Sequence, residues 1–191
     1  MSQPALPPGQ RFAADWPVLH YGPVPRQRPD TWNFTVVGAT ADGLEHQLDA
    51  AAFAALPRVD VVGDLHCVAH WTVPGCCWTG VAAQTLIDLF PPQDDVTHVM
   101  AWAEYGYSAN MRLTDLAAPL AVFATHRNGE PLTPEHGWPL RLVVPHLYAW
   151  KGPKWVRGIE YLTLPARGFW EVRGYHDHAD PWNEERYSYQ E

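Results

Sequence analysis

The alternation of apolar and polar residues along the chain predicts many short strands. The segment 32–37 alternates in this way, and β-branched or apolar runs at 58–62, 96–103, 140–144 and 155–164 are also typical of strands. A turn is expected at 38–43. The pair Asn128-Gly129 lies between apolar runs, which is a strong signal for a β-hairpin.

Only two segments have the pattern of helices. The Ala-rich stretch 48–56 predicts a short helix with Asp49 near its start. Thr79 is expected to cap a second helix at about 80–90, which Pro91-Pro92 would end. The aromatic and charged tail from Gly168 onward is expected to be an irregular cover. Short strands with few helices predict an α+β fold.

The length and composition fit one globular domain. The chain has 191 residues, of which 47% are hydrophobic. We expect an extended or disordered lead at 1–14 and a single domain at 15–191. The net charge of −8 argues against nucleic-acid binding. The apolar stretches fall short of the roughly 20 residues of a membrane span. The first ten residues lack a secretory signal, so a cytoplasmic location is expected.

Three cysteines raise the question of metal or redox chemistry. An odd number argues against a disulfide framework, and adjacent Cys76 and Cys77 are poorly placed to bond to each other. Cys67 follows a predicted strand, in a loop of the sequence Asp64-Leu65-His66-Cys67. A thiolate there would be a soft ligand for a transition metal. The alternative is that Cys67 is a small buried core residue.

The segment from His136 to Arg157 is a candidate anion site. It contains Arg141 and Lys154, and Lys151 and Lys154 are the only lysines of the chain. Guanidinium and ammonium groups that lie close together suit a phosphate. The alternative is a solvated loop with ordinary surface lysines.

The C-terminal segment His176, Asp177, His178 and Asp180 is a third candidate. Imidazole and carboxylate groups can bind zinc, but this spacing matches no closed zinc pattern. Hydrogen bonds at the surface are the alternative. The sequence contains no phosphate-binding loop, dinucleotide-binding glycine motif or nucleophile elbow.

Taken together and in order, the motifs of this chain resemble the sulfite oxidase-type molybdopterin oxidoreductases, in particular a bacterial branch without a heme domain. The motifs are Gly22-Pro23-Val24-Pro25, Asp64-Leu65-His66-Cys67, Trp78-Thr79-Gly80-Val81, Gly106-Tyr107, Gly137-Trp138-Pro139-Leu140-Arg141, Trp150-Lys151, Lys154-Trp155-Val156 and Gly168-Phe169-Trp170-Glu171. The similarity extends from about residue 16 to residue 187.

The resemblance implies a mixed α+β domain around one molybdenum-molybdopterin. The metal of this family is held by the two dithiolene sulfurs of the cofactor, one Cys thiolate and oxygen ligands, and Cys67 matches that Cys. Arg141 and Lys154 match the residues that bind the cofactor phosphate. The other expected cofactor-binding residues are Tyr21, His66, His136, Lys151, Gly152 and Pro153.

The sequence also departs from the sulfite oxidases. Leu19 lies where they carry an Arg for the oxyanion substrate, and Val68-Ala69-His70-Trp71 replaces a basic stretch after the metal ligand. We therefore predict a molybdenum-dependent oxidoreductase that transfers an oxygen atom to or from a small substrate other than sulfite, together with an electron-transfer partner. The alternatives are a cofactor-free or inactive binding module and a zinc hydrolase that uses the His-rich tail.

Overall fold

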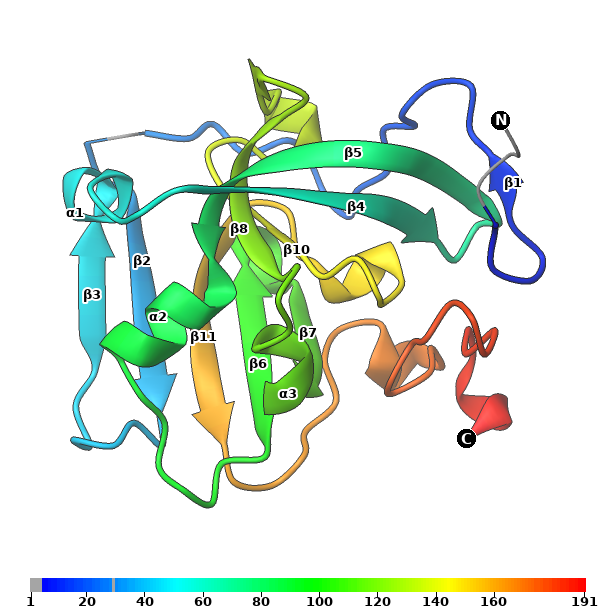
Figure 1. The fold of residues 1–191 in the computed structure, drawn as a ribbon. Helices are drawn as coiled ribbons and strands as arrows, with labels where there is room; N and C mark the ends of the chain where they lie inside the picture. The colour runs from blue at the N-terminus through cyan, green and yellow to red at the C-terminus, as the bar shows by residue number, and fades with distance from the viewer. Residues whose placement is uncertain (1–4, 29) are drawn as a thin grey trace.

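The computed structural model describes residues 5–28 and 30–191, so the first four residues of the predicted lead lie outside it. Two mixed β-sheets pack face to face, and short helices cover their edges (Figure 1). The predicted α+β class is confirmed. No described helix has the length and apolar character needed to cross a membrane.

The first sheet contributes Leu65, Cys67, Trp71 and Arg141 to the wall of the candidate active site. Within the described residues it has the order β1-β5-β8-β10, with β4 beside β5 and β9 beside β8. Its strands are β1 (Arg11–Phe12), β4 (Val59–Cys67), β5 (Trp71–Ala82), β8 (Val122–Arg127), β9 (Glu130–Pro131) and β10 (Arg141–Val143). β1 pairs in parallel with β5, and the other pairs are antiparallel.

The second sheet has the order β3-β2-β11-β6-β7. Its strands are β2 (Asn33–Gly38), β3 (His46–Asp49), β6 (His98–Ala103), β7 (Ser108–Arg112) and β11 (Val156–Leu162). β11 runs parallel to β2 and antiparallel to β6. The main core fills the space between the two sheets, and Phe34, Phe123 and Leu142 are fully buried in it.

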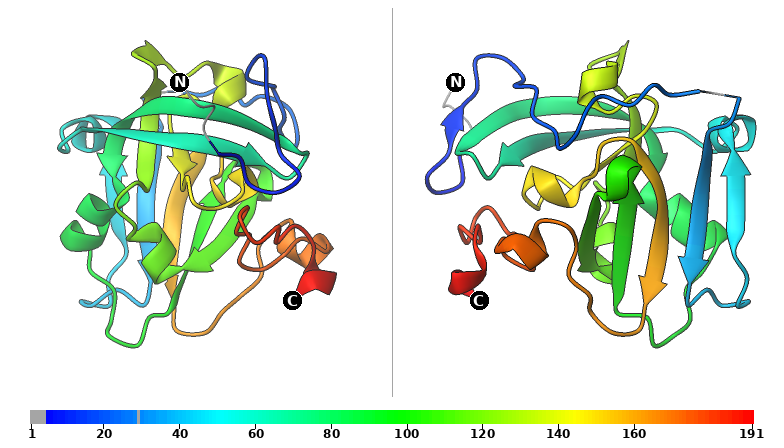
Figure 2. Two further views of the ribbon diagram at one scale, coloured as in Figure 1. Left: turned by 45° about the vertical axis from the view of Figure 1, so that its right-hand side comes forward. Right: turned by 180° about the vertical axis from the view of Figure 1, so that it is seen from behind.

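The helices are short and lie at the ends of strands. The α-helices are α1 (Ala50–Ala54), α2 (Ala83–Leu89) and α3 (Leu113–Leu116), and the 3-10 helices are η1 (Glu104–Gly106), η2 (Pro134–His136), η3 (Ala149–Lys151), η4 (Glu171–Arg173) and η5 (Ser188–Gln190). The segment after β11 forms an irregular tail beside the β4–β5 end of the first sheet (Figure 2). Arg186 of this tail donates to the backbone oxygens of Val68 and Pro8, at 2.7 and 3.2 Å.

Local sequence signals predicted some elements well. The Asp49 carboxylate caps α1 by accepting a hydrogen bond from the Ala52 N–H at 2.7 Å. Asn128 and Gly129 both have positive φ angles and close the β8–β9 hairpin.

Two local predictions were wrong. Thr79 does not cap a helix, because it lies inside β5 and pairs with Asp60 of β4; α2 begins only at Ala83. Cys67 does not follow its strand in a loop but is the last residue of β4. In both cases the long β4–β5 pairing extends the strand beyond its local pattern.

Candidate active site

A cavity of about 350 Å³ opens where β4 turns into β5, and segments far apart in the sequence form its walls. One wall is the extended segment 16–21, and another is the loop around η3. The residues that line it are Trp16, Pro17, Leu19, His20, Tyr21, Leu65, Cys67, Val68, Ala69, Trp71, Glu104, Tyr107, Arg141, Ala149, Trp150, Gly152, Lys154, Trp155, Trp170 and Tyr175. This set includes the predicted residues Tyr21, Cys67, Arg141, Gly152 and Lys154.

Cys67 presents a free thiol to this cavity. Its backbone oxygen accepts hydrogen bonds from Gln10 Nε2 and from the His70 N–H, at 3.0 and 3.1 Å, which fixes the turn between β4 and β5. Burial raises the pKa of the thiol, while the charges of Arg141 and Lys154 oppose that change. The protein alone thus favours the thiol form of Cys67, and a bound metal ion would stabilise its thiolate form.

Arg141 and Lys154 bring two cations to the same cavity. Their backbones form an isolated antiparallel bridge, so the two side chains are held side by side. Arg141 is only 4% exposed. Neither residue makes a salt bridge within residues 5–28 and 30–191; Arg141 donates to the backbone oxygen of His136 at 3.3 Å, and Lys154 to that of Glu135 at 2.7 Å.

The electrostatic cost of this arrangement is visible in the pKa values. Burial lowers the pKa of Arg141 to about 10. Burial, and next the neighbouring Arg141 charge, lower the pKa of Lys154 to about 7. A buried guanidinium beside a half-buried ammonium is unfavourable when neither is paired within the described structure, unless an anion binds between them.

Three buried N–H or ring nitrogen atoms around this cavity lack a hydrogen-bond partner among the described residues. They are Arg141 Nε, Trp150 Nε1 and His136 Nε2. His136 lies behind the wall, where its ring stacks on Trp16 with 3.8 Å between ring centroids. Buried polar groups are almost always paired, so these atoms indicate a polar ligand. The Cys67 thiol suits the metal of a molybdopterin, and Arg141 and Lys154 suit its phosphate. The unpaired nitrogen atoms suit the polar atoms of the pterin.

Two glycines allow the backbone segments around the cavity to approach each other closely. A Cβ atom on Gly152 would lie 2.3 Å from the Leu142 oxygen, which leaves no room for a side chain. Gly137 has a φ of +117°, a conformation that favours glycine, and packs against the Cβ atoms of Arg141 and Lys154. The backbone of Pro153 lies nearby but does not line the cavity, and its oxygen accepts from the Leu142 N–H at 3.0 Å.

His66 and Lys151 were predicted site residues that do not line the cavity. His66 lies on the opposite face of β4 from Leu65 and Cys67, as strand geometry requires. Its Nδ1 is 2.9 Å from Thr72 Oγ1, and burial lowers its pKa. Lys151 is fully buried and forms an ion pair with Glu171 at 2.6 Å. It also donates to the side-chain and backbone oxygens of Asn110.

The Lys151 network therefore joins the η3 loop to the tail. Burial lowers the pKa of Lys151 and raises that of Glu171, and the attraction between the two charges opposes both changes. The pair lies just behind Trp150 and Gly152, which line the cavity. From this position the Lys151–Glu171 pair stabilises the η3 loop without lining the cavity.

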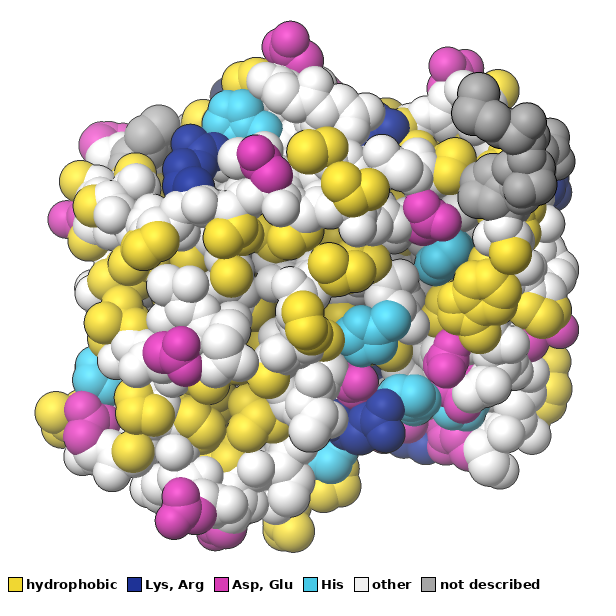
Figure 3. Space-filling view, viewed as in Figure 1, with side chains coloured by type: hydrophobic (Ala, Val, Ile, Leu, Met, Phe, Trp, Pro, Cys, Tyr) yellow, Lys and Arg dark blue, Asp and Glu magenta, His cyan; other side chains and the backbone are white. Residues whose placement is uncertain are grey.

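The His-rich tail segment forms a different network. Histidine, acidic and basic side chains gather where the tail meets α3 (Figure 3). The carboxylate of Asp115 is 2.9 Å from Arg112 Nε and 3.2 Å from His146 Nε2, and His178 Nδ1 is 2.8 Å from Glu185. In residues 5–28 and 30–191, no group of three or more His, Cys, Asp or Glu side chains has an arrangement that could hold a metal ion.

Sequence reasoning missed several residues of the cavity wall. Tyr107 donates a hydrogen bond to the Trp150 oxygen at 2.6 Å, and desolvation raises its pKa well above the usual value. Glu104 brings a carboxylate to the cavity and lies 3.8 Å from Arg157. Trp16 and His20 lie next to the predicted Tyr21. Tyr107 belongs to the Gly106-Tyr107 motif but was given no role, and no local pattern marks the others, since only the folded chain brings 16–21, 104–107 and 150–155 together.

Comparisons with known proteins agree with this geometry. A family model described as the oxidoreductase molybdopterin binding domain matches residues 21–170. The chain is similar to the uncharacterized oxidoreductase YuiH of Bacillus subtilis (strain 168), with 40% identity over 190 residues, 96% of this chain and 92% of that protein.

More distant similarities were also found. The catalytic subunit MsrP of a protein-methionine-sulfoxide reductase from Gluconobacter oxydans is 27% identical over 162 residues, which cover 74% of this chain and 50% of MsrP. This chain thus corresponds to about half of that relative. The crystal structure of the sulfane dehydrogenase SoxCD from Paracoccus pantotrophus matches with a TM-score of 0.68 and 18% identity, over 76% of this chain and 41% of that one. This last similarity concerns the fold.

Proposed function

Because this chain belongs to the family of oxidoreductases with a molybdopterin-binding domain, we propose that its cavity holds molybdenum-molybdopterin and catalyses two-electron oxygen-atom transfer on a small, neutral substrate. The observation that carries the proposal is that the Cys67 thiol meets Arg141 and Lys154 in one cavity, where neither cation forms a salt bridge with a described residue. A soft thiolate suits the metal and paired cations suit the phosphate.

Each residue has a defined task in this proposal. Cys67 is the single protein ligand of the metal, and Arg141 and Lys154 bind the cofactor phosphate. The unpaired Nε1–H of Trp150 provides a hydrogen bond for a polar atom of the pterin, and His136 supports the wall from behind through its stacking on Trp16. The bound metal supplies the two-electron oxygen-atom transfer. The protein binds and orients the cofactor and excludes water from it.

Tyr21 and Gly152 complete the wall, and Tyr21 is 47% exposed at the mouth. His66, Lys151 and Pro153 take supporting positions around the bound cofactor, because their polar groups already have partners within the protein. The three free cysteines are compatible with the reducing cytoplasm, which stays a prediction.

The mouth of the cavity favours a neutral substrate. Leu19 lines it and is 53% exposed, and the aromatic side chains of Trp71 and Trp170 add apolar surface. Glu104 adds a carboxylate that would repel a dianion. His70, the basic residue after Cys67, bonds instead to the Gly9 oxygen at 3.0 Å and does not line the cavity. Together with the name of the MsrP relative, this supports a sulfoxide or a similar N-oxide.

Such a reduction converts a sulfoxide, two electrons and two protons into a thioether and water. A donor must deliver the electrons, so an electron-transfer partner is part of the proposal. We expect faster turnover with dimethyl sulfoxide or methionine sulfoxide and a reduced dye than with sulfite and an oxidised acceptor. A kcat/KM for sulfite of about 10⁴ M⁻¹s⁻¹ or more, the ordinary range of enzymes, would contradict the choice of substrate.

A further inference from the structure

A second cavity of about 380 Å³ lies away from the cofactor cavity, at the end of the molecule that holds α1. The two cavities share no lining residue. Its walls are α1 and the segment before β2 on one side, and β5, β8 and β9 of the first sheet on the other. Its lining residues are Gln27, Trp32, Ala50, Phe53, Ala54, Arg58, Gly80, Val81, Thr125, His126, Pro131, Trp138, Pro139 and Leu140.

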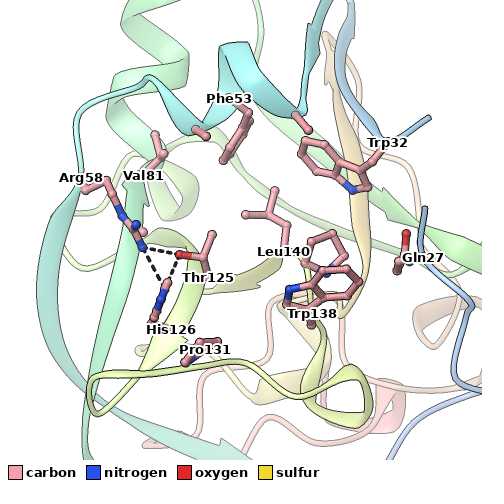
Figure 4. Close-up of a pocket in the computed structure, with 14 residues that line it drawn as sticks. Gln27, Trp32, Phe53, Arg58, Val81, Thr125, His126, Pro131, Trp138 and Leu140 are labelled. Carbon is pink, nitrogen blue, oxygen red and sulfur yellow. Dashed lines mark hydrogen bonds between the residues drawn. The ribbon is translucent and has the colours of Figure 1, made fainter. Parts of the chain in front are cut away.

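The walls of this second cavity are mainly rings and aliphatic groups. Figure 4 shows Trp32 and Trp138 on one side of the open space, with Phe53 and Leu140 beside them. Trp32 and Phe53 pack edge to face, with 5.5 Å between ring centroids. The volume falls within the range of small-molecule sites. The aromatic side chains of Trp32, Phe53 and Trp138 offer faces and edges against which a flat apolar ring of a ligand could pack.

The polar groups of the cavity point to a negatively charged ligand. Arg58 lies on the side opposite Trp32 and Trp138 (Figure 4). Its Nη2 donates to Thr125 Oγ1 at 2.6 Å and lies 2.9 Å from His126 Nδ1, which fixes the guanidinium. Arg58 is exposed, so its other guanidinium N–H groups are open to solvent or to a ligand. They make no hydrogen bond, and Arg58 makes no ion pair, within the part of the chain that the structure describes.

Unpaired donors provide a second and independent sign of a ligand. Trp32 is only 6% exposed, and its Nε1–H has no partner among residues 5–28 and 30–191. The Gln27 amide nitrogen is also buried without a partner there. The lining residues include no Asp or Glu. Arg58 also lines a neighbouring groove that contains Asp60. The Asp60 carboxylate accepts a hydrogen bond from Thr79 there, and it forms no ion pair with Arg58 in the described structure.

We propose that this cavity is a binding site for a small aromatic carboxylate, with the ring between Trp32, Phe53 and Trp138 and the carboxylate on Arg58. An apolar cavity, open to solvent on the side of a hydrogen-bonded guanidinium and without an acidic lining residue, is complementary to such a ligand. Arg–carboxylate hydrogen bonds are charge-assisted and give orientation as well as affinity. The site is separate from the proposed oxidoreductase chemistry.

Phenylacetate is a suitable probe, and phenylacetamide is its uncharged counterpart of nearly the same shape. Isothermal titration of the cofactor-loaded protein should give a dissociation constant for phenylacetate below about 1 mM, a realistic affinity for ten non-hydrogen atoms. The amide should bind at least about tenfold more weakly, because it lacks the charge-assisted contact. No binding of phenylacetate, or equal binding of acid and amide, would overturn the proposal.

Arg58→Gln should weaken phenylacetate binding at least about tenfold, and Arg58→Lys should weaken it less. The matched control is Arg11→Gln. Arg11 is an exposed arginine on β1, at the far end of the first sheet from α1 (Figure 1). Binding by Arg58→Gln equal to that of the control would refute the site. Because the acid–amide comparison uses the unaltered chain, the test holds even if a variant is unstable.

Discussion

The two lysines of the chain should respond in opposite ways to the same substitution. Lys154 lies in the proposed phosphate site and forms no salt bridge with any residue that the structure describes, and its pKa is lowered to about 7. Lys151 is fully buried but paired with Glu171 at 2.6 Å. We predict that Lys154→Met stabilises the cofactor-free protein and that Lys151→Met destabilises it.

The size of the effect follows from the pKa of Lys154. The drop from 10.5 to about 7 corresponds to about 5 kcal/mol at 1.36 kcal/mol per pKa unit, which is an upper bound. Water at the cavity mouth screens part of this cost, and the hydrogen bond to Glu135, worth about 1 kcal/mol, is lost in the variant. A net gain of about 1–2 kcal/mol should raise the Tm by roughly 2–8 °C in a domain of this size.

The gain should also depend on pH in a defined direction. The folded pKa of Lys154 lies below its unfolded value, so the folded protein favours the neutral amine. The cost of charging it is complete below about pH 7 and disappears above the unfolded value of 10.5. The stability difference between Lys154→Met and the unaltered protein should therefore be largest near pH 6 and small near pH 10.

The assay is urea unfolding of both variants, produced without the cofactor, at pH 6 and near pH 10. Lys151→Met serves as the contrast, because it leaves the Glu171 carboxylate buried and unpaired, at a cost of about 3–5 kcal/mol. Lower stability of Lys154→Met at pH 6, or a gain that does not change with pH, would refute the reasoning. The same variant should retain less molybdenum when it is produced with the cofactor.

Three further outcomes are expected. Arg141→Ala should lower the molybdenum content, because it removes a charge-assisted contact of about 1.5–3 kcal/mol; metal analysis showing full occupancy would count against the phosphate site. Burial alone would raise the pKa of Asp115, but hydrogen bonds from His146 and Arg112 lower it overall. The Asp115 carboxylate therefore stabilises the fold above the pKa that it has in the unfolded chain, and this stabilisation is lost as the pH falls. In acid titrations between pH 5 and pH 2, Asp115→Asn should therefore lose less stability than the unaltered protein. Cys77→Ser should leave turnover unchanged, and a loss of activity would call for a role of that thiol.

Elements with strong local signals could be predicted from the sequence. Asp49 marks the start of α1, and Asn128-Gly129 closes the β8–β9 hairpin, because capping and tight turns depend on neighbouring residues only. The segment 79–82 was misassigned because its structure depends on distant partners. There, β5 pairs with β4 on one side and β8 on the other, and these pairs extend the strand to Ala82.

In the candidate site too, some residues could be predicted from the sequence and others depend on distant partners. Cys67, Arg141 and Lys154 could be identified from residue type and resemblance, and the structure places all three in one cavity. The environment of Lys151 could not be foreseen, because its partner Glu171 lies in the tail, twenty positions further along the chain. Such pairs are decided by tertiary packing, which a sequence pattern does not contain.

The most direct test of the central claim is X-ray absorption at the molybdenum edge, with metal analysis, on the unaltered protein and on Cys67→Ser. We expect about one molybdenum per chain with three sulfur ligands, two from the cofactor and one from Cys67. The variant should keep its pterin through Arg141 and Lys154 and show one sulfur ligand fewer at any metal that it retains. A protein without molybdenum, or a Cys67→Ser variant with an unchanged number of sulfur ligands, would contradict the account.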